Sequence, residues 1–145
     1  MRLYLDTSAL VKRYIKEPGS DRVRKMFIDA YNGDALLYTS LFNIGEAMSA
    51  MHKATRKAGR PDAYPVLRGR LLGDVRRLTR LGAMKLIPLT VALILDAGRY
   101  VEKHGLYIAD ALQIASAAKA QSPLVTGDEK LCNTAAQEGV ECLLV

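Results

Sequence analysis

The chain runs Leu3-Tyr4-Leu5-Asp6-Thr7-Ser8-Ala9-Leu10 close to its N-terminus, and this stretch decides the fold. Its first three residues form a short apolar run with no polar face, which is typical of a strand buried on both sides. Asp6 and the two hydroxyl residues after it are types that begin helices, so we expect the strand to turn directly into a helix. Asp6 then either caps that helix or faces the crevice in which open α/β sheets bind ligands.

Short apolar runs and helical patterns alternate along the rest of the chain. We expect further strands at 35–38, 84–87, 123–126 and 140–144, and helices at 8–16, 20–31, 39–57, 62–81, 90–104, 108–119 and 128–137. Short strands separated by helices predict an α/β fold with three layers, α/β/α, built on a parallel sheet. We find no repeat or linker, and expect one domain over residues 1–145.

The composition is that of an ordinary globular domain. Of the 145 residues, 50% are hydrophobic and 25% charged, which suffices for a core without disulfides or metals. No apolar run approaches the roughly 20 residues of a membrane span, and no secretory leader is recognisable, so we expect a cytoplasmic protein with no membrane association. Cys132 and Cys142 fit no zinc spacing, and we expect two reduced thiols in the core.

Positive charge is concentrated in one segment. The net charge is +6, and residues 53–85 hold ten Lys or Arg against only Asp62 and Asp74. The remainder, with 11 basic and 13 acidic residues, has a net charge of −2. A local basic patch is typical of a surface that meets a polyanion, although a solvated helical face has the same composition.

Carboxylates follow two of the expected strands and occupy two of the expected helices. Asp128 follows Leu124-Val125-Thr126-Gly127, where a turn or a helix cap would also use it. Asp110 lies in the first turn of a helix that is apolar almost all round, and a charge in such a helix needs a partner or the helix dipole. Glu46 lies roughly opposite the stripe of Leu41, Ile44, Met48 and Met51, so periodicity alone does not select it.

Four blocks of the sequence, in order, resemble the signature blocks of the PIN domain. They are Leu5-Asp6-Thr7-Ser8-Ala9-Leu10, Asn43-Ile44-Gly45-Glu46-Ala47, Ile108-Ala109-Asp110-Ala111-Leu112-Gln113-Ile114-Ala115 and Thr126-Gly127-Asp128-Glu129-Lys130-Leu131. The resemblance covers essentially the whole chain. At this length it extends to the VapC toxins of type II toxin–antitoxin pairs.

The resemblance implies a fold, an activity and a site. The fold is a five-stranded parallel sheet of order 3-2-1-4-5, and the activity is that of a metal-dependent endoribonuclease. Asp6, Glu46, Asp110 and Asp128 correspond to the catalytic acids, with Ser8 and Thr126 as nearby hydroxyl helpers. The resemblance also implies RNA as substrate, a small VapB-like antitoxin as partner, and a homodimer.

Crowded carboxylates raise one another's pKa values, and a divalent cation relieves their repulsion. Oxygen ligands without a paired His or Cys favour Mg²⁺ or Mn²⁺. We therefore expect Asp6, Asp110 and Asp128 to hold the metal, with Glu46 completing the cage or orienting the water. His52 and His104 are far apart in sequence, and we do not expect a histidine metal site.

The basic segment has two competing uses. It is a reasonable RNA track, for which Arg76 and Arg77 are the residues to test, because phosphate contacts give affinity without sequence choice. The leucines between the arginines would instead offer anchors for an antitoxin or a second subunit; they are Leu67, Leu71, Leu72 and Leu78. Both uses are compatible.

Other functions stay open from the sequence. A PIN-type nuclease for ribosomal RNA maturation or DNA flaps would share the fold, although flap nucleases need long insertions for which this chain has little room. A non-catalytic RNA-binding or scaffolding domain would be expected to lack at least one of the four acids. A phosphoacceptor or nucleotide-binding domain would explain Asp6, but it leaves Asp110 and Asp128 unexplained and the chain has no glycine-rich phosphate loop.

Overall fold

The computed structural model describes all 145 residues, and its strands form one five-stranded parallel sheet. The strands are β1 (Arg2–Leu5), β2 (Leu36–Ser40), β3 (Met84–Ile87), β4 (Leu124–Thr126) and β5 (Cys142–Leu144), in the spatial order β3-β2-β1-β4-β5. The first strand is central, and its Tyr4 is in register with Tyr38 on one side and Leu124 on the other. The α/β class and the strand order 3-2-1-4-5 are thus confirmed.

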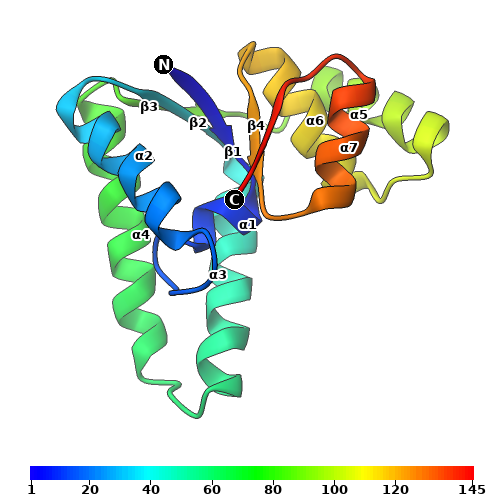
Figure 1. The fold of residues 1–145 in the computed structure, drawn as a ribbon. Coiled ribbons are helices and arrows are strands. Elements are labelled where there is room, and N and C mark those ends of the chain that lie inside the picture. The colour runs from blue at the N-terminus through cyan, green and yellow to red at the C-terminus, as the bar shows by residue number, and fades with distance from the viewer.

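Helices cover both faces of the sheet (Figure 1). On one side lie α1 (Thr7–Val11), α2 (Ser20–Asn32), α3 (Leu41–Lys57) and α4 (Ala63–Arg80), and on the other α5 (Val91–His104), α6 (Ile108–Ala120) and α7 (Glu129–Gln137). No helix is long and apolar enough to cross a membrane.

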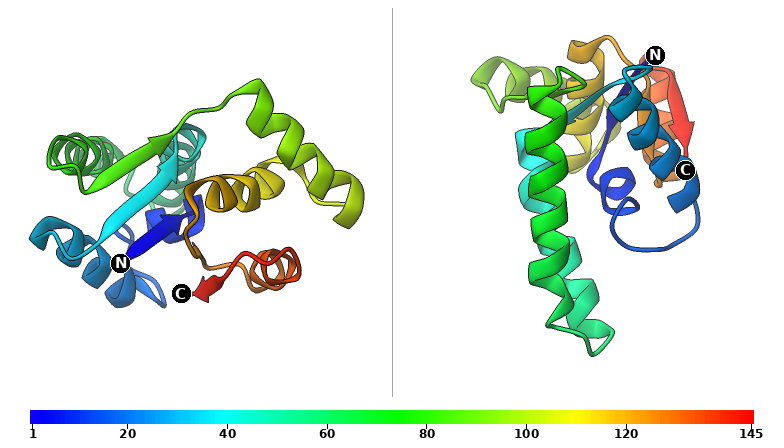
Figure 2. Two further views of the ribbon diagram at one scale, coloured as in Figure 1. Left: turned by 90° about the horizontal axis from the view of Figure 1, so that it is seen from above. Right: turned by 90° about the vertical axis from the view of Figure 1, so that its left-hand side faces the viewer.

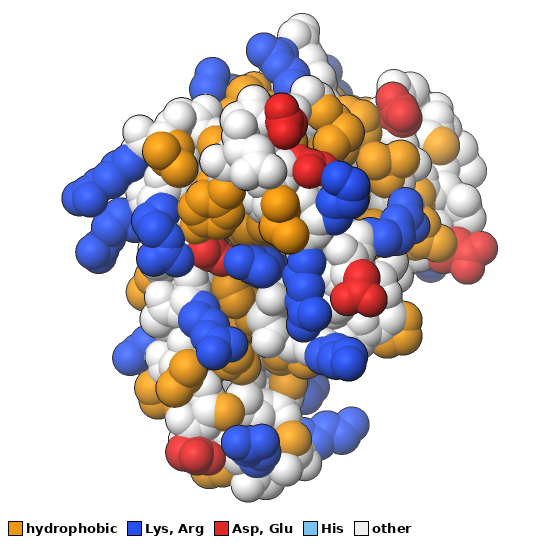
Figure 3. All heavy atoms as spheres, turned by 60° about the vertical axis from the view of Figure 1, so that its left-hand side comes forward, with side chains coloured by type: hydrophobic (Ala, Val, Ile, Leu, Met, Phe, Trp, Pro, Cys, Tyr) orange, Lys and Arg blue, Asp and Glu red, His pale blue; other side chains and the backbone are white.

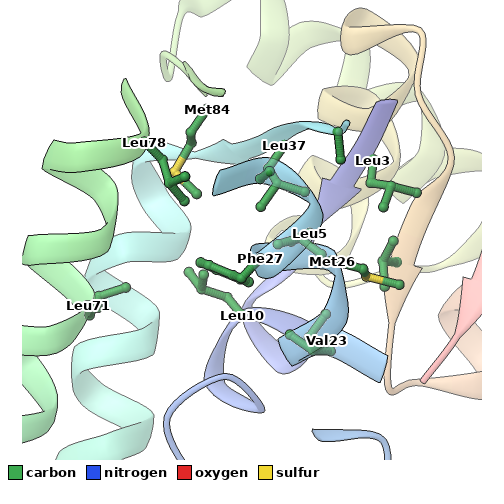
Figure 4. Close-up of a cluster of buried hydrophobic side chains, with 14 of the residues drawn as sticks. Leu3, Leu5, Leu10, Val23, Met26, Phe27, Leu37, Leu71, Leu78 and Met84 are labelled. Carbon is green, nitrogen blue, oxygen red and sulfur yellow. The ribbon is translucent and has the colours of Figure 1, made fainter. Parts of the chain in front are cut away.

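The strands supply side chains to two separate cores because successive residues of a strand point to opposite faces. Leu3 and Leu5 pack with Phe27 of α2 and with side chains of α3 and α4 (Figure 4). Tyr4, between them, packs on the other face with α5, α6 and α7. The first strand is therefore buried on both sides, as its apolar run predicts.

Polar side chains at the strand ends fix where several helices begin. Asp6 accepts a hydrogen bond from the Ala9 backbone N–H, and Ser40, Thr90 and Asp128 cap α3, α5 and α7 in the same way. Each cap satisfies a backbone N–H that the helix leaves without an internal partner. The sheet consequently passes into helices directly at its carboxyl edge.

The α3 and α4 helices form a long hairpin that projects beyond the rest of the domain (Figures 1 and 2). They contain 17 and 18 residues, and the turn between them carries Gly59 in the left-handed conformation, at φ 70°. The part of the hairpin nearest the sheet packs into the core through Met51, Leu71 and Leu78. Its tip is exposed.

The first helix is much shorter than predicted. It ends at Val11 rather than at Lys16. From Lys12 to Tyr14, each backbone N–H donates to the carbonyl three residues before it, whereas in an α-helix it donates to the carbonyl four residues before it. The Lys12 ammonium then donates to the Pro18 carbonyl at 2.7 Å. This bond folds the following loop back on the helix end.

The expectation of two reduced thiols in the core is also wrong. Cys132 and Cys142 are joined in a disulfide and both are half-buried, because α7 returns β5 to the sheet with the two Cα atoms 5.5 Å apart. In α3 the buried face contains Asn43, Ala47 and Met51, whereas Leu41 is 50% exposed. The buried face is thus rotated relative to the stripe of Leu41, Ile44, Met48 and Met51, with Met51 common to both.

Candidate functional site

All four predicted acids line one pocket at the carboxyl edge of the sheet. Asp6 follows β1 and Asp128 follows the neighbouring β4, while Glu46 and Asp110 come from α3 and α6. The cavity has a volume of about 310 Å³. It lies where the strand order reverses about β1, the position at which open α/β sheets bind ligands.

Asp6 is the most deeply buried of the four acids, and both its carboxylate oxygens accept hydrogen bonds. Oδ1 accepts from the Ser8 hydroxyl at 2.7 Å and from the Ala9 N–H at 2.8 Å. Oδ2 accepts from the Thr126 hydroxyl at 2.5 Å. Asp6 therefore caps α1 and lines the pocket at the same time, so the two roles predicted for it are both present.

Ser8 and Thr126 connect Asp6 to the turn that carries Asp128. The Ser8 hydroxyl accepts from the Gly127 N–H at 2.8 Å, and the Thr126 hydroxyl accepts from the Asp128 N–H at 3.0 Å. Each hydroxyl thus donates to Asp6 and accepts from a backbone amide of the next strand end. The two carboxylates are held in one rigid arrangement, as the interpretation of Ser8 and Thr126 as helpers requires.

Glu46 and Asp110 reach the pocket from opposite helix layers. Glu46 accepts a hydrogen bond from the Thr7 hydroxyl at 2.7 Å, which fixes α3 to the start of α1. Asp110 lies in the first turn of α6 and is half-buried. Hydrophobic periodicity does not identify Glu46. The side of α3 that carries it faces a polar pocket rather than solvent, and the pattern of apolar residues does not distinguish the two.

Burial and mutual repulsion disfavour the charged forms of two of these acids. Burial raises the pKa of Asp6 above its ordinary value, and the nearby Asp128 raises it further, against the opposing effect of the hydrogen bonds. Burial and Asp128 likewise raise the pKa of Asp110. The pocket thus concentrates negative charge that the protein alone does not neutralise.

The donor set fits a hard divalent cation. Every acidic ligand offers oxygen, and a cation among them would relieve the repulsion between Asp128 and its two neighbours. As they stand, no three acidic, His or Cys side chains converge closely enough to coordinate one ion. The His104 ring does not line the pocket and contacts Glu138 instead.

Several residues of the pocket went unrecognised in the sequence. Glu17 lines it and pairs with Lys12 at 3.3 Å, and Thr7 holds Glu46. Gln113 lines it from α6, one turn beyond Asp110. A polar residue within an almost wholly apolar helix is the signal that could have identified Gln113.

The basic residues of the segment 53–85 are all exposed, and Lys and Arg predominate on the face that contains the hairpin (Figure 3). The two arginines predicted as RNA contacts differ in their surroundings. Arg76 is exposed, whereas the Arg77 guanidinium donates to Asp74 at 2.9 Å and to the Tyr31 hydroxyl at 3.2 Å. Arg77 therefore has a structural role whether or not it also meets RNA.

Comparison with known families matches residues 3–137 to the PIN domain. No curated protein matches the chain by sequence. The match includes all four blocks that carry the resemblance in the sequence.

Solved structures share the fold at low sequence identity. The FitAcB complex of Neisseria gonorrhoeae has a TM-score of 0.67 and 19% identity, covering 97% of this chain and 96% of that one. VapC20 of Mycobacterium tuberculosis, a toxin that cleaves the sarcin–ricin loop, has a TM-score of 0.63 and 13% identity over 90% and 93% of the two chains. VapBC2 of Rickettsia felis, bound to a promoter DNA fragment, has a TM-score of 0.62 and 17% identity over 99% and 98%.

Proposed function

The chain belongs to the PIN domain family, and from that premise we propose that it is a divalent-metal-dependent endoribonuclease. It acts as the toxin of a type II toxin–antitoxin pair, formed by a single PIN domain over residues 1–145. The observation that carries the proposal is that Asp6, Glu46, Asp110 and Asp128 all line one pocket at the switch point of the sheet.

Asp6, Asp110 and Asp128 would hold the ion, Mg²⁺ or Mn²⁺, and Glu46 would complete the cage or orient the attacking water. A bound ion of this kind lowers the pKa of water and offsets charge on the phosphoryl oxygens. The hydroxyls of Ser8 and Thr126 keep Asp6 facing the pocket. Hydrolysis by water leaves 5′-phosphate and 3′-hydroxyl ends, so a cyclic phosphate product would contradict this mechanism.

RNA meets the protein along the basic hairpin, from which it reaches the acidic pocket. The exposed cations of α3 and α4 supply phosphate contacts, and none of them lines the pocket itself. Phosphate contacts of this kind depend strongly on salt and discriminate little between sequences. The choice of RNA target then depends on the shape of the protein surface around the pocket.

An antitoxin binds the apolar groove beside the hairpin. Tyr14, Ile15, Ala54, Val66 and Leu67 line this groove, with Arg60 and Arg70 at its border. The apolar floor and basic border suit an amphipathic helix with acidic residues. FitAcB and VapBC2 are both toxin–antitoxin complexes, which supports a partner of this kind.

The chain forms a homodimer through α5. Exposed apolar side chains gather at the start of this helix, at Leu89, Val91, Ile94 and Leu95, and such a patch is typical of an interface.

A cytoplasmic location follows from the RNA substrate. The Cys132–Cys142 disulfide is unusual for that compartment outside hyperthermophiles.

The decisive experiment is cleavage of a labelled structured RNA by the purified protein with Mg²⁺, with Mn²⁺ and with excess chelator. We expect metal-dependent cutting by the parent and by Asp21→Asn, whose side chain is 94% exposed on α2. Asp6→Asn should fold but lose most of the activity. Salt-dependent RNA binding without cutting under any metal would favour a non-catalytic RNA-binding domain instead.

A further inference from the structure

A buried polar network lies directly beneath the acidic pocket. It consists of Tyr4 on β1, Thr39 at the end of β2, Asn43 on α3 and Gln113 on α6, with exposed fractions between 0% and 4%. The proposed chemistry uses none of these residues. Buried polar groups cost stability unless they are paired, so a complete network at this place needs an explanation.

The centre of the network is a reciprocal pair of side-chain amides. The Asn43 amide donates to Gln113 Oε1 at 2.9 Å, and the Gln113 amide donates to Asn43 Oδ1 at 2.9 Å. The Tyr4 hydroxyl donates to the same Gln113 Oε1 at 2.9 Å. The pair therefore joins the helix layers on the two sides of the sheet across its central strand.

Each amide is also tied to the backbone next to an acid of the pocket. Asn43 Nδ2 lies 3.2 Å from the carbonyl of Leu5, the residue before Asp6, and Thr39 donates to that same carbonyl at 2.9 Å. Gln113 Nε2 donates to the carbonyl of Ala109, the residue before Asp110, at 3.1 Å. The network thus touches the chain at the positions that precede Asp6 and Asp110.

The two amides lie about one helical turn from Glu46 and Asp110, so the network also affects where these two acids lie. Asn43 stands three residues before Glu46 and Gln113 three residues after Asp110, which is about one helical turn in each case. Apolar contacts between helices tolerate small slips, whereas a satisfied buried network specifies one arrangement.

We propose that the Asn43–Gln113 amide pair is a positioning device that sets the separation of α3 and α6, and hence of Glu46 and Asp110, for binding a divalent ion. The proposal rests on the metal-dependent function proposed above. Asn43 and Gln113 are positioning residues: they act through the acids and through the Leu5 and Ala109 carbonyls. Neither is assigned contact with the ion or with RNA.

The test compares Mn²⁺ affinity with stability in four variants. Gln113→Leu and Asn43→Leu each leave a buried amide without its partner, and we expect both to lose stability and about 10- to 100-fold in Mn²⁺ affinity. The double variant is made together with Tyr4→Phe, because the buried Tyr4 hydroxyl would otherwise lose its partners. It replaces the network by apolar groups, so its stability should recover toward that of the parent while its affinity stays low. Val23→Ala removes core volume on α2, which carries no pocket residue, and should lower stability with unchanged affinity.

Isothermal titration calorimetry with MnCl2 gives the affinity, and thermal unfolding in chelator gives the stability. Affinity that recovers together with stability in the double variant, or that equals the parent's in all variants, would overturn the positioning role alone. A parent protein that binds no Mn²⁺ would overturn the proposed function and this assignment with it. RNA cleavage by the same variants supplies a second readout, in which the double variant should remain slow at saturating RNA.

Discussion

At the scale of single residues, Asp6 combines deep burial with repulsion from Asp128, and together these outweigh the hydrogen bonds that its carboxylate accepts. Asp6→Asn removes that buried charge while keeping the shape, so the variant should melt a few degrees above the parent in chelator, at roughly 2–4 °C per kcal/mol. Addition of Mn²⁺ should raise the melting temperature of the parent and leave the variant unchanged. A variant that Mn²⁺ stabilises as much as it does the parent would remove Asp6 from the metal site.

Asp74 is a second acid whose charge affects the stability of the whole fold. Burial alone would raise its pKa, but hydrogen bonds from Tyr31, Arg77 and Tyr14 and the charge of Arg13 outweigh burial and lower it. An acid whose pKa is lowered by folding stabilises the folded state at pH values above its ordinary pKa. That stabilisation is lost as the pH falls through the folded-state pKa.

Asp74→Asn should therefore lower the free energy of unfolding by about 2–3 kcal/mol at pH 7, because several donors lose a charged acceptor. The deficit should shrink as the pH falls below 3.8 toward the lowered folded-state pKa, where the parent becomes protonated as well. Urea unfolding of both proteins between pH 7 and 3 measures this. A deficit that is independent of pH would show that the Asp74 charge does not matter.

At the scale of elements, the disulfide ties α7 to β5. It closes a short loop, with a sequence separation of 10, so reduction should cost about 2–3 kcal/mol. The melting temperature of the parent should fall in the reductant TCEP, whereas that of the double variant Cys132→Ser/Cys142→Ser should not respond to it. Two thiols titrating in unreduced, denatured protein would show that the bond is absent.

The order and type of the elements could be predicted from the sequence because local signals are strong there. The predicted strand at 84–87 and the helix capped by Thr90 agree with the structure. The signals fail where a distant contact decides. The α1 helix ends early, before a loop that folds back through the Lys12–Pro18 bond, and only the approach of α7 to β5 brings Cys132 to Cys142.

The acids at strand ends could likewise be predicted, whereas their support could not. Asp6 and Asp128 follow apolar runs, so topology alone brings them together. Glu46 needed the family resemblance, because the buried face of its helix includes Asn43, which lies outside the apolar stripe of the pattern. The Asn43–Gln113 pair joins residues 70 positions apart, which no local pattern encodes.

At the scale of the whole molecule, charge is divided between an acidic pocket and a basic hairpin. Arg76 and Arg80 are exposed and make no ion pair within the chain, so reversing both tests the RNA track without disturbing Asp74. Arg76→Glu/Arg80→Glu should weaken RNA binding and lower the dependence of log K on log salt by about one for each phosphate that is no longer neutralised.

Arg99→Glu/Lys119→Glu is the matched control for that pair, since it changes the charge by the same amount and both side chains are exposed in the other helix layer, on α5 and α6. It should leave both the RNA affinity and the salt dependence close to those of the parent. Filter binding at several salt concentrations measures the two quantities. Equal losses in the control and the hairpin variant would mean that net charge matters and the hairpin does not.

The exposed turn between α3 and α4 also makes the hairpin a natural site of proteolytic nicking. Lys57 and Ala58 are exposed at its tip, whereas the bond after Arg60 precedes Pro61 and resists trypsin. Ala58 and Arg60 also border the groove assigned to the antitoxin. Trypsin should therefore cut the free protein first at Lys57, and the slowing of that single cut provides a footprint of any partner that occupies the groove.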